Sequence, residues 1–148
     1  MLITHDISLG LYSSSRLLIQ LIQSKLLEYS LTYPQYLVMS ELWESDGLRV
    51  NQIGEKLNLD SGTLTPLLKK LESQNYIKRV RGEADERTVT AELTYPGKSL
   101  QSRVEESLKE MENSLAERFT ENTAELNQTI QALLEQLQTI KKESTWKN

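Results

Sequence analysis

Hydroxyl-bearing and basic side chains gather in residues 59–72, LDSGTLTPLLKKLE, and give this stretch chemistry of its own. Ser61, Thr63 and Thr65 carry hydroxyl groups that can hydrogen-bond phosphate oxygens or base edges. The backbone N–H groups of a helix's first turn also suit phosphate oxygens. Lysines follow, and a lysine can neutralise a phosphate. These residue types are typical of a helix whose start approaches an anionic surface closely.

Leucines in this stretch recur at the spacing of one helical face, so the helix has an apolar side that holds it to a core. They are Leu64, Leu67, Leu68 and Leu71. The opposite side carries Gly62, Pro66, Lys69 and Ser73, with Thr63, Thr65 and Lys70 on the flanks. Because proline is tolerated only near a helix start, the first turn is expected near residues 61–63. Asp60 or Ser61 is then an N-cap, whether or not the helix also touches a ligand.

Positive charge is concentrated around this helix, although the whole chain carries a net charge of −4. Within residues 61–82 the charged side chains are Lys69, Lys70, Lys78, Arg79 and Arg81 against Glu72 alone. A charged segment follows, with Arg81, Glu83, Asp85, Glu86 and Arg87. An arginine at an exposed tip fits the narrow, electronegative minor groove of DNA, although such charge runs are often only solvated surface. Glu83 and Glu86 would repel phosphate, so we expect them to point away from it.

The surrounding periodicity predicts the elements that position these residues. Residues 7–30 are apolar on more than one face, which indicates burial against a partner chain. Thr32 and Gln35 match a capping box, which predicts a helix from about Tyr33 to Glu44. A short helix is expected in residues 50–57, β-strands in 76–81 and 88–93, and two long amphipathic helices after them. The predicted fold class is mainly α with a small β-hairpin: a winged helix-turn-helix with N- and C-terminal dimerisation helices.

Several classes of protein are excluded by what the sequence lacks. There is no cysteine and only one histidine, His5, so neither disulfides, thiolate catalysis nor a zinc site is expected. No nucleotide-binding, metalloprotease or nucleophile motif is present, and we predict no enzyme activity and no cofactor. No signal peptide or membrane-spanning run is found, so we expect a cytoplasmic protein with no membrane partner.

Three motifs together resemble the MarR family of dimeric transcriptional regulators. They are LDSGTLTPLLKKLESQNYIKR, the DER at Asp85–Arg87, and the LTYPGK at Leu93–Lys98. Within that family, LYSSSR and LTYPQYLVMSELWE resemble the branch of organic hydroperoxide resistance regulators, OhrR. The resemblance implies a single MarR-type domain over residues 1–148, with the winged helix at about 32–93 and dimerisation helices at about 5–30 and 95–143.

The resemblance also implies a homodimer that represses transcription at a near-palindromic double-stranded DNA operator. The expected DNA-binding residues are Ser61, Gly62, Thr63, Thr65, Pro66, Lys69, Lys70, Arg81, Asp85 and Arg87. In the family the arginine of DER enters the minor groove and the aspartate orients it. Those roles would fall to Arg87 and Asp85.

The position of the family's peroxide sensor is where this sequence departs from the OhrR pattern. The reactive cysteine lies four residues before the tyrosine of the LYxSSR motif, and here that position is Ser8, with Tyr12 following. A serine hydroxyl lacks the oxidation chemistry of a thiolate, so peroxide sensing by this chain is not expected. Tyr12 and Tyr33 match tyrosines of the family's sensor pocket, whereas a third is Ile22 here. Simple core packing explains the two tyrosines equally well.

Two explanations of Ser8 stay open. Either the protein has diverged and its dimer pocket takes a small apolar or phenolic effector, or serine has been introduced for cysteine to lock the reduced form. The function predicted is a DNA-binding regulator of the OhrR/MarR type. The alternatives are a ligand-responsive MarR-type regulator unrelated to peroxide, and a helical interaction protein that does not bind DNA.

Overall fold

The predicted winged helix-turn-helix is present in the computed structural model, which describes residues 2–85 and 87–144. Its elements are α1 (Ile3–Leu26), the 3-10 helix η1 (Leu27–Tyr29), α2 (Tyr33–Glu44), β1 (Leu48–Arg49), α3 (Val50–Leu57), α4 (Ser61–Ser73), β2 (Ile77–Arg81), β3 (Val89–Leu93), α5 (Tyr95–Arg118) and α6 (Thr123–Ser144). The chain divides into two compact units, Met1–Met111 and Glu112–Asn148. The first holds all the elements from α1 to β3 and most of α5.

The start of α2 is fixed by the capping box that the sequence predicted. The Thr32 backbone N–H donates to Gln35 Oε1 at 2.9 Å, and the Gln35 backbone N–H donates to Thr32 Oγ1 at 3.4 Å. Two of the backbone donors at the helix entrance are thereby satisfied. The predicted bounds, Tyr33 to Glu44, are confirmed.

A tight turn separates α3 from α4 and gives the helix-turn-helix its bend. Asn58 ends α3 with φ 53°, a left-handed conformation that asparagine tolerates better than most residues. The Leu59 backbone N–H then returns to the Gly54 carbonyl at 2.9 Å. Asp60 caps the next helix, so α4 begins at Ser61, within the range that the sequence predicted. Pro66 lies inside α4 and lacks the N–H that would otherwise bond the Gly62 carbonyl.

The wing is part of a three-stranded antiparallel sheet rather than an isolated hairpin. The strand order is β1–β3–β2, with Leu48 opposite Ala91 and Arg79 opposite Ala91 on the other side. β1 was not predicted from the sequence, because two residues are too short to show alternation. This third strand ties the helix-turn-helix to β3 through main-chain pairing.

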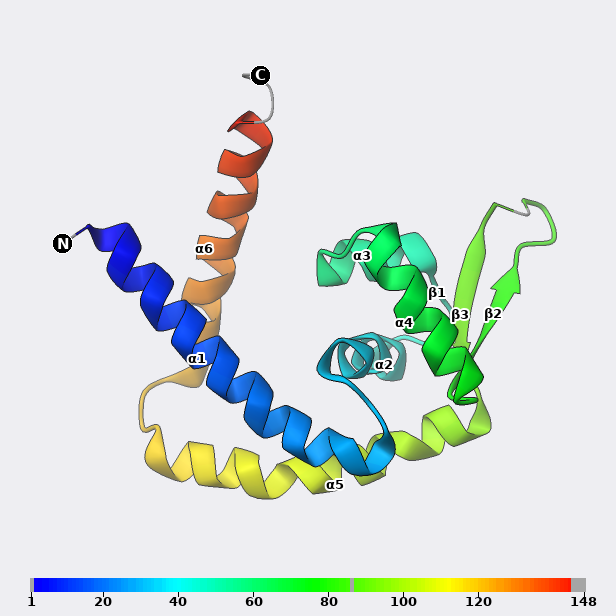
Figure 1. Ribbon diagram of the computed structural model, residues 1–148, viewed down its shortest axis with the longest axis horizontal. Coiled ribbons are helices and arrows are strands. Elements are labelled where there is room, and N and C mark those ends of the chain that lie inside the picture. The colour runs from blue at the N-terminus through cyan, green and yellow to red at the C-terminus, as the bar shows by residue number, and fades with distance from the viewer. Residues whose placement is uncertain (1, 86, 145–148) are drawn as a thin grey trace. The chain divides into compact units, whose positions relative to one another are not determined.

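One core joins these elements, and α4 reaches it through its leucine stripe. Leu64, Leu68 and Leu71 are buried, and Leu67 packs at its edge. The other large, fully buried side chains are Leu26, Leu31, Met39, Leu42, Ile53, Ile77, Leu100, Val38 and Val104. Figure 1 shows α4 lying between α3 and the β2–β3 hairpin. The polar side of α4 is therefore left to face outward.

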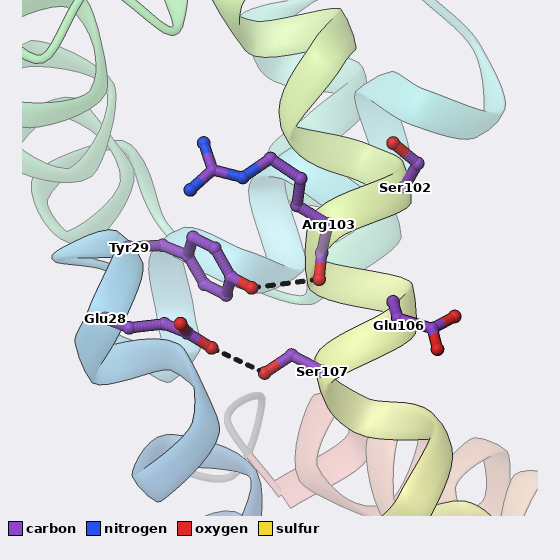
Figure 2. Close-up of a pocket in the computed structure, with 6 residues that line it drawn as sticks. All are labelled: Glu28, Tyr29, Ser102, Arg103, Glu106 and Ser107. Carbon is purple, nitrogen blue, oxygen red and sulfur yellow. Dashed lines mark hydrogen bonds between the residues drawn. The ribbon is translucent and has the colours of Figure 1, made fainter.

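The link between α1 and α2 is fastened to α5 across a solvent-open hollow (Figure 2). The Tyr29 hydroxyl donates to the Arg103 carbonyl at 2.9 Å, and the Arg103 guanidinium lies 5.2 Å from the Tyr29 ring centroid. The Ser107 hydroxyl donates to Glu28 Oε1 at 2.7 Å and lowers the pKa of Glu28. Because these polar groups hydrogen-bond one another, we interpret the hollow as a structural contact between η1 and α5.

Helices α1 and α6 bury little within the described chain. Leu26 is buried in α1, and no described side chain of α6 is. Their exposed apolar residues include Leu9, Leu11, Tyr12, Leu17, Leu18, Leu21, Leu126, Ile130, Leu134, Leu137 and Ile140. Across residues 2–85 and 87–144, none of the helices has the length and apolar content to span a bilayer.

Candidate nucleic-acid interface

The N-terminus of α4 carries its own carboxylate, which changes the chemistry expected there. Asp60 Oδ1 accepts the Thr63 backbone N–H at 2.8 Å. This amide lowers the pKa of Asp60, so the side chain stays ionised at neutral pH. A carboxylate at this place competes with phosphate for the helix N-terminus. Phosphate binding by the first-turn amides is therefore less available than the sequence indicated, and side chains become the main candidates.

Hydroxyl groups on the outer side of α4 are available for such contacts. Within the described residues, no hydrogen bond engages the hydroxyl of Ser61 or of Thr65, although Thr65 is half-buried. By contrast, the Ser73 hydroxyl donates to the Lys70 carbonyl at 2.7 Å in the last turn. Thr63 interacts with Asp60 through its side chain as well as its amide. The free hydroxyls thus belong to the first half of the helix.

The basic cluster seen in the sequence is smaller in the structure than its composition suggested. Arg79 Nη2 lies 2.7 Å from Glu72 Oε2, and Lys78 Nζ lies 3.0 Å from Glu92 Oε2. In the same region, Lys56 Nζ pairs with Glu41 at 2.7 Å. These cations are offset by acidic partners and are poorly suited to neutralise a second anion. Lys78 and Arg79, which count among the basic residues of this region in the sequence, each have an acidic partner in the structure.

The basic residues that lack an acidic partner within the described part of the chain define a smaller candidate interface. Among the described residues of 32–93, those without a carboxylate partner are Arg49, Lys69, Lys70, Arg81 and Arg87. All five are exposed. Lys69 and Lys70 lie on α4, and Arg81 and Arg87 flank the wing tip. Unpaired cations on adjacent elements provide the charge that a DNA backbone requires.

Arg49 was not identified from the sequence. It ends β1 opposite Thr90, while Arg81 ends β2 opposite Val89, so the two arginines lie near the same end of the sheet on its opposite edge strands. Two strand spacings separate such edges by roughly 10 Å. The one signal for Arg49 in the sequence was its position directly before the first helix of the helix-turn-helix.

The wing tip is closed by backbone contacts around Asp85. Asp85 Oδ1 accepts the Arg87 backbone N–H at 3.0 Å, and the Thr88 N–H donates to the Asp85 carbonyl at 2.9 Å. A Cβ at Gly82 would lie 2.8 Å from that carbonyl, so glycine permits this turn. Asp85 thus shapes the backbone that presents Arg87; the described side chains show no ion pair between the two. Glu83 is exposed, and Glu86 lies outside the described residues.

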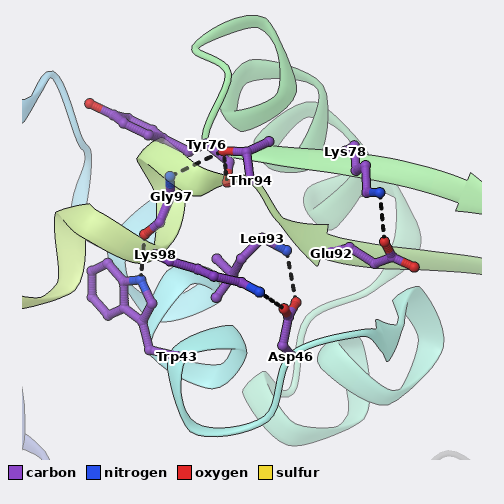
Figure 3. Close-up of polar contacts among 9 residues, drawn as sticks. All are labelled: Trp43, Asp46, Tyr76, Lys78, Glu92, Leu93, Thr94, Gly97 and Lys98. Carbon is purple, nitrogen blue, oxygen red and sulfur yellow. Dashed lines mark hydrogen bonds and ion pairs between the residues drawn. The ribbon is translucent and has the colours of Figure 1, made fainter.

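The base of the wing is held by Asp46, in the turn between α2 and β1 (Figure 3). Its carboxylate accepts the Leu93 backbone N–H at 2.7 Å and pairs with Lys98 Nζ at 3.2 Å. Partial burial works to raise the pKa of Asp46, but the Leu93 amide and Lys98 outweigh it and the pKa is lowered. Asp46 therefore connects the end of β3 to the start of α5.

The predicted sensor residues are not brought together within one chain. Ser8 and Tyr12 lie exposed on α1, whereas Tyr33 begins α2, where burial raises its pKa. The Tyr33 backbone N–H donates to Gln23 of α1, which lies about 16 Å along that helix from Tyr12 at 1.5 Å per residue. None of the three lines the hollow in Figure 2. A shared pocket would need residues from a second chain.

A family model described as "Transcriptional regulator SarA/Rot" matches residues 20–106. The chain belongs to this family. The matched segment contains every predicted DNA-binding residue and excludes Ser8 and Tyr12. SarA/Rot proteins are transcriptional regulators rather than enzymes.

Known proteins similar to this SarA/Rot regulator agree with its fold. The organic hydroperoxide resistance transcriptional regulator of Bacillus subtilis is 47% identical over 93 residues, which are 63% of each chain. The structure of reduced AbfR bound to DNA has a TM-score of 0.83 and 35% identity, and 93% of each chain is covered. A MarR regulator from Methanosarcina mazei has a TM-score of 0.78 at 23% identity over 92% of this chain and 99% of that one, which shows a shared fold. The chain spans 43% to 64% of the lengths of the curated relatives it matches.

Proposed function

We propose that this SarA/Rot regulator is a cytoplasmic, homodimeric repressor that binds a near-palindromic DNA operator. In this proposal the first half of α4 enters the major groove, and Arg87 on the wing enters the adjacent minor groove. Two copies related by a twofold axis would read two half-sites, because operator symmetry mirrors dimer symmetry.

The distribution of unpaired cations is the observation that carries the proposal. Carboxylates pair with Lys56, Lys78 and Arg79, while Lys69 and Lys70, beside the α4 hydroxyls, have no carboxylate partner among the described residues. A protein that kept the fold for helix–helix contacts alone would gain nothing from this arrangement. Counterion release from several phosphates would supply much of the affinity.

The outer side of α4 also has the shape that groove entry requires. Gly62 and Ser61 are exposed and small, so the helix backbone can approach base edges closely. The buried leucines on the other side hold α4 to the core, so it can enter the groove without losing its packing. We assign major-groove or phosphate contacts to Ser61, Thr63, Thr65 and Lys69. We assign contacts with the DNA sugar-phosphate backbone to Lys70, Arg81 and Arg49.

The exposed apolar faces of α1 and α6 support the homodimer. A 24-residue helix with its apolar side chains in water is unfavourable, and a large exposed apolar surface is typical of a subunit interface. Leu17 and Leu21 are 57% and 55% exposed in the single chain and lie one turn apart on α1. We assign the winged helix to residues 32–93 and dimerisation to residues 5–30 and 95–143.

Replacing both Leu17 and Leu21 with glutamate should convert the dimer to monomers, because charges would be buried at the interface. Molar mass measured by light scattering after size exclusion checks this. Val80→Glu is the matched control: Val80 is 37% exposed on β2, within the winged helix and outside the residues assigned to dimerisation. A dimer that survives the double change, or one lost equally in the control, contradicts the assignment.

For sensing, we propose that Ser8 stands where OhrR-branch regulators carry the reactive cysteine, and that this chain does not respond to peroxide through a thiol. The absence of any cysteine from the chain supports this. A small apolar or phenolic effector, bound between α1 of one subunit and Tyr33 of the other, would replace it. Organic hydroperoxide that releases the operator from this chain would contradict the assignment, provided its methionines stay unoxidised.

Band-shift titrations over a range of salt concentrations test the proposed function. Specific binding to its upstream operator should weaken steeply as salt rises, with a slope that grows with the number of neutralised phosphates. A scrambled duplex of equal length is the control. Failure to bind the upstream DNA at low salt would favour a helical interaction protein instead. Transcription from the operator with and without the protein distinguishes repression from activation.

A further inference from the structure

Helix α4 and the wing are joined by the Glu72 carboxylate as well as by the backbone. α4 ends at Ser73, and β2 begins at Ile77 after a turn in which Asn75 has φ 60°. Across this turn, Glu72 Oε1 accepts the Arg79 backbone N–H at 3.0 Å. Glu72 Oε2 accepts the Arg79 Nε and Nη2 groups at 3.0 and 2.7 Å. Glu72, in the last turn of α4, therefore hydrogen-bonds both the main chain and the side chain of Arg79, the third residue of β2.

This contact restricts the orientation of β2 relative to α4 more than it adds to the stability of the fold. A guanidinium that meets one carboxylate through two N–H groups is restricted in angle as well as in distance. The side chains of Arg79 and Glu72 are 30% and 36% exposed, so solvent screens part of their attraction. The main effect of the contact is therefore geometric, because the hydrogen bond from the Arg79 backbone N–H to Glu72 fixes the backbone of β2 relative to α4.

No other ion pair among the described residues connects α4 with the wing strands. The second ion pair of the wing, between Lys78 and Glu92, runs across the hairpin from β2 to β3 (Figure 3). It does not reach α4. The two pairs thus have similar charges and neighbouring positions, but only one of them joins the helix to the wing.

We propose that Glu72 is a positioning residue for DNA binding. Through Arg79 it sets the direction of the wing relative to α4, so that Arg87 reaches the minor groove while α4 occupies the major groove. The inference rests on the proposed function, since it assigns a role to Glu72 only if the wing touches DNA.

The substitution Glu72→Gln separates this role from simple electrostatics because the two predict opposite signs. Removing a negative charge and freeing Arg79 should strengthen DNA binding if charge alone matters. If Glu72 positions the wing, operator affinity should instead fall by roughly tenfold, as expected when an arginine contact is misplaced. Glu92→Gln removes the same charge from the same wing and should leave affinity unchanged or slightly higher.

A double-mutant cycle with Arg87→Ala gives the decisive readout. Once Arg87 is absent, the minor-groove contact that Glu72 is proposed to position is gone, so adding Glu72→Gln should cost much less affinity than it does alone. Arg79→Lys keeps the charge but loses the two-pronged contact, and it should show a smaller loss in the same direction. Thermal unfolding of each variant checks that the fold is kept; Arg79→Lys serves if Glu72→Gln does not fold.

The outcomes separate this inference from the proposed function. Normal binding by Arg87→Ala would overturn the placement of the wing on DNA, and the role of Glu72 with it. Weakened binding by Arg87→Ala together with parental or tighter binding by Glu72→Gln and Arg79→Lys would overturn the positioning role alone. Losses from Glu72→Gln and Arg87→Ala that simply add would also overturn it.

Discussion

Arg87→Ala is expected to weaken operator binding by about 10- to 100-fold, corresponding to roughly 1–3 kcal/mol for one specific arginine contact. Arg87 is exposed, carries no acidic partner among the described residues and is presented by a turn that Asp85 holds. A narrow minor groove concentrates negative potential, so a guanidinium inserted there is worth more than one on an open backbone. Band shifts at fixed salt measure the loss.

Two comparisons give this result its meaning. Thr63→Ala should cost less, on the order of 1 kcal/mol, since it removes one polar contact. Arg103→Ala removes an equal charge from α5, where the guanidinium covers the Tyr29 ring, and should change affinity little. Equal losses for the two arginines would mean that overall charge, and not the wing tip, governs binding. The dimer should persist in all three variants.

Gly97→Ala is expected to lower the free energy of unfolding by about 3 kcal/mol, the upper range for overpacking in a close-packed site. A Cβ at this buried position would overlap the Tyr76 carbonyl. The same backbone is fixed from two other sides. Trp43 Nε1–H donates to the Gly97 carbonyl at 2.9 Å, and the Gly97 N–H donates to Thr94 Oγ1 at 3.1 Å (Figure 3). The helix start therefore cannot shift without losing these bonds.

Urea unfolding followed by circular dichroism measures this change. Ser99→Ala, two residues further along α5, is the control; Ser99 is exposed and its hydroxyl only returns to the Tyr95 carbonyl. Its effect should stay within about 0.5 kcal/mol, as for most surface substitutions. A Gly97→Ala protein as stable as the parent would show that α5 is free to move away from Tyr76.

Local signals were sufficient for the helices and the hairpin. The capping box at Thr32 and Gln35 predicted the start of α2, because a cap is made by residues three apart. The leucine stripe of α4 predicted its buried face for the same reason. The strand β1 was not predicted, since its two residues acquire their conformation only by pairing with β3.

The candidate interface was only partly predictable. The sequence located the helix start and the wing tip, whose residues are contiguous. It did not show which cations are paired, because the partners of Arg79 and Lys56 lie 7 and 15 residues away and meet them only in the folded chain. It also missed Arg49, which joins the same region through sheet register.

The sequence by itself determined the winged helix-turn-helix fold class, the order of the elements other than β1, and the residues that face outward from α4, because caps, helical periodicity and turns depend on neighbours in the chain. Only the tertiary structure decided which charges lack a partner and how the wing is joined to α4. The physical reason is that ion pairing and strand register are contacts between distant segments. Glu72 is the one acidic residue in residues 61–82 of the sequence, and its contact with Arg79 across the turn is seen only in the folded chain.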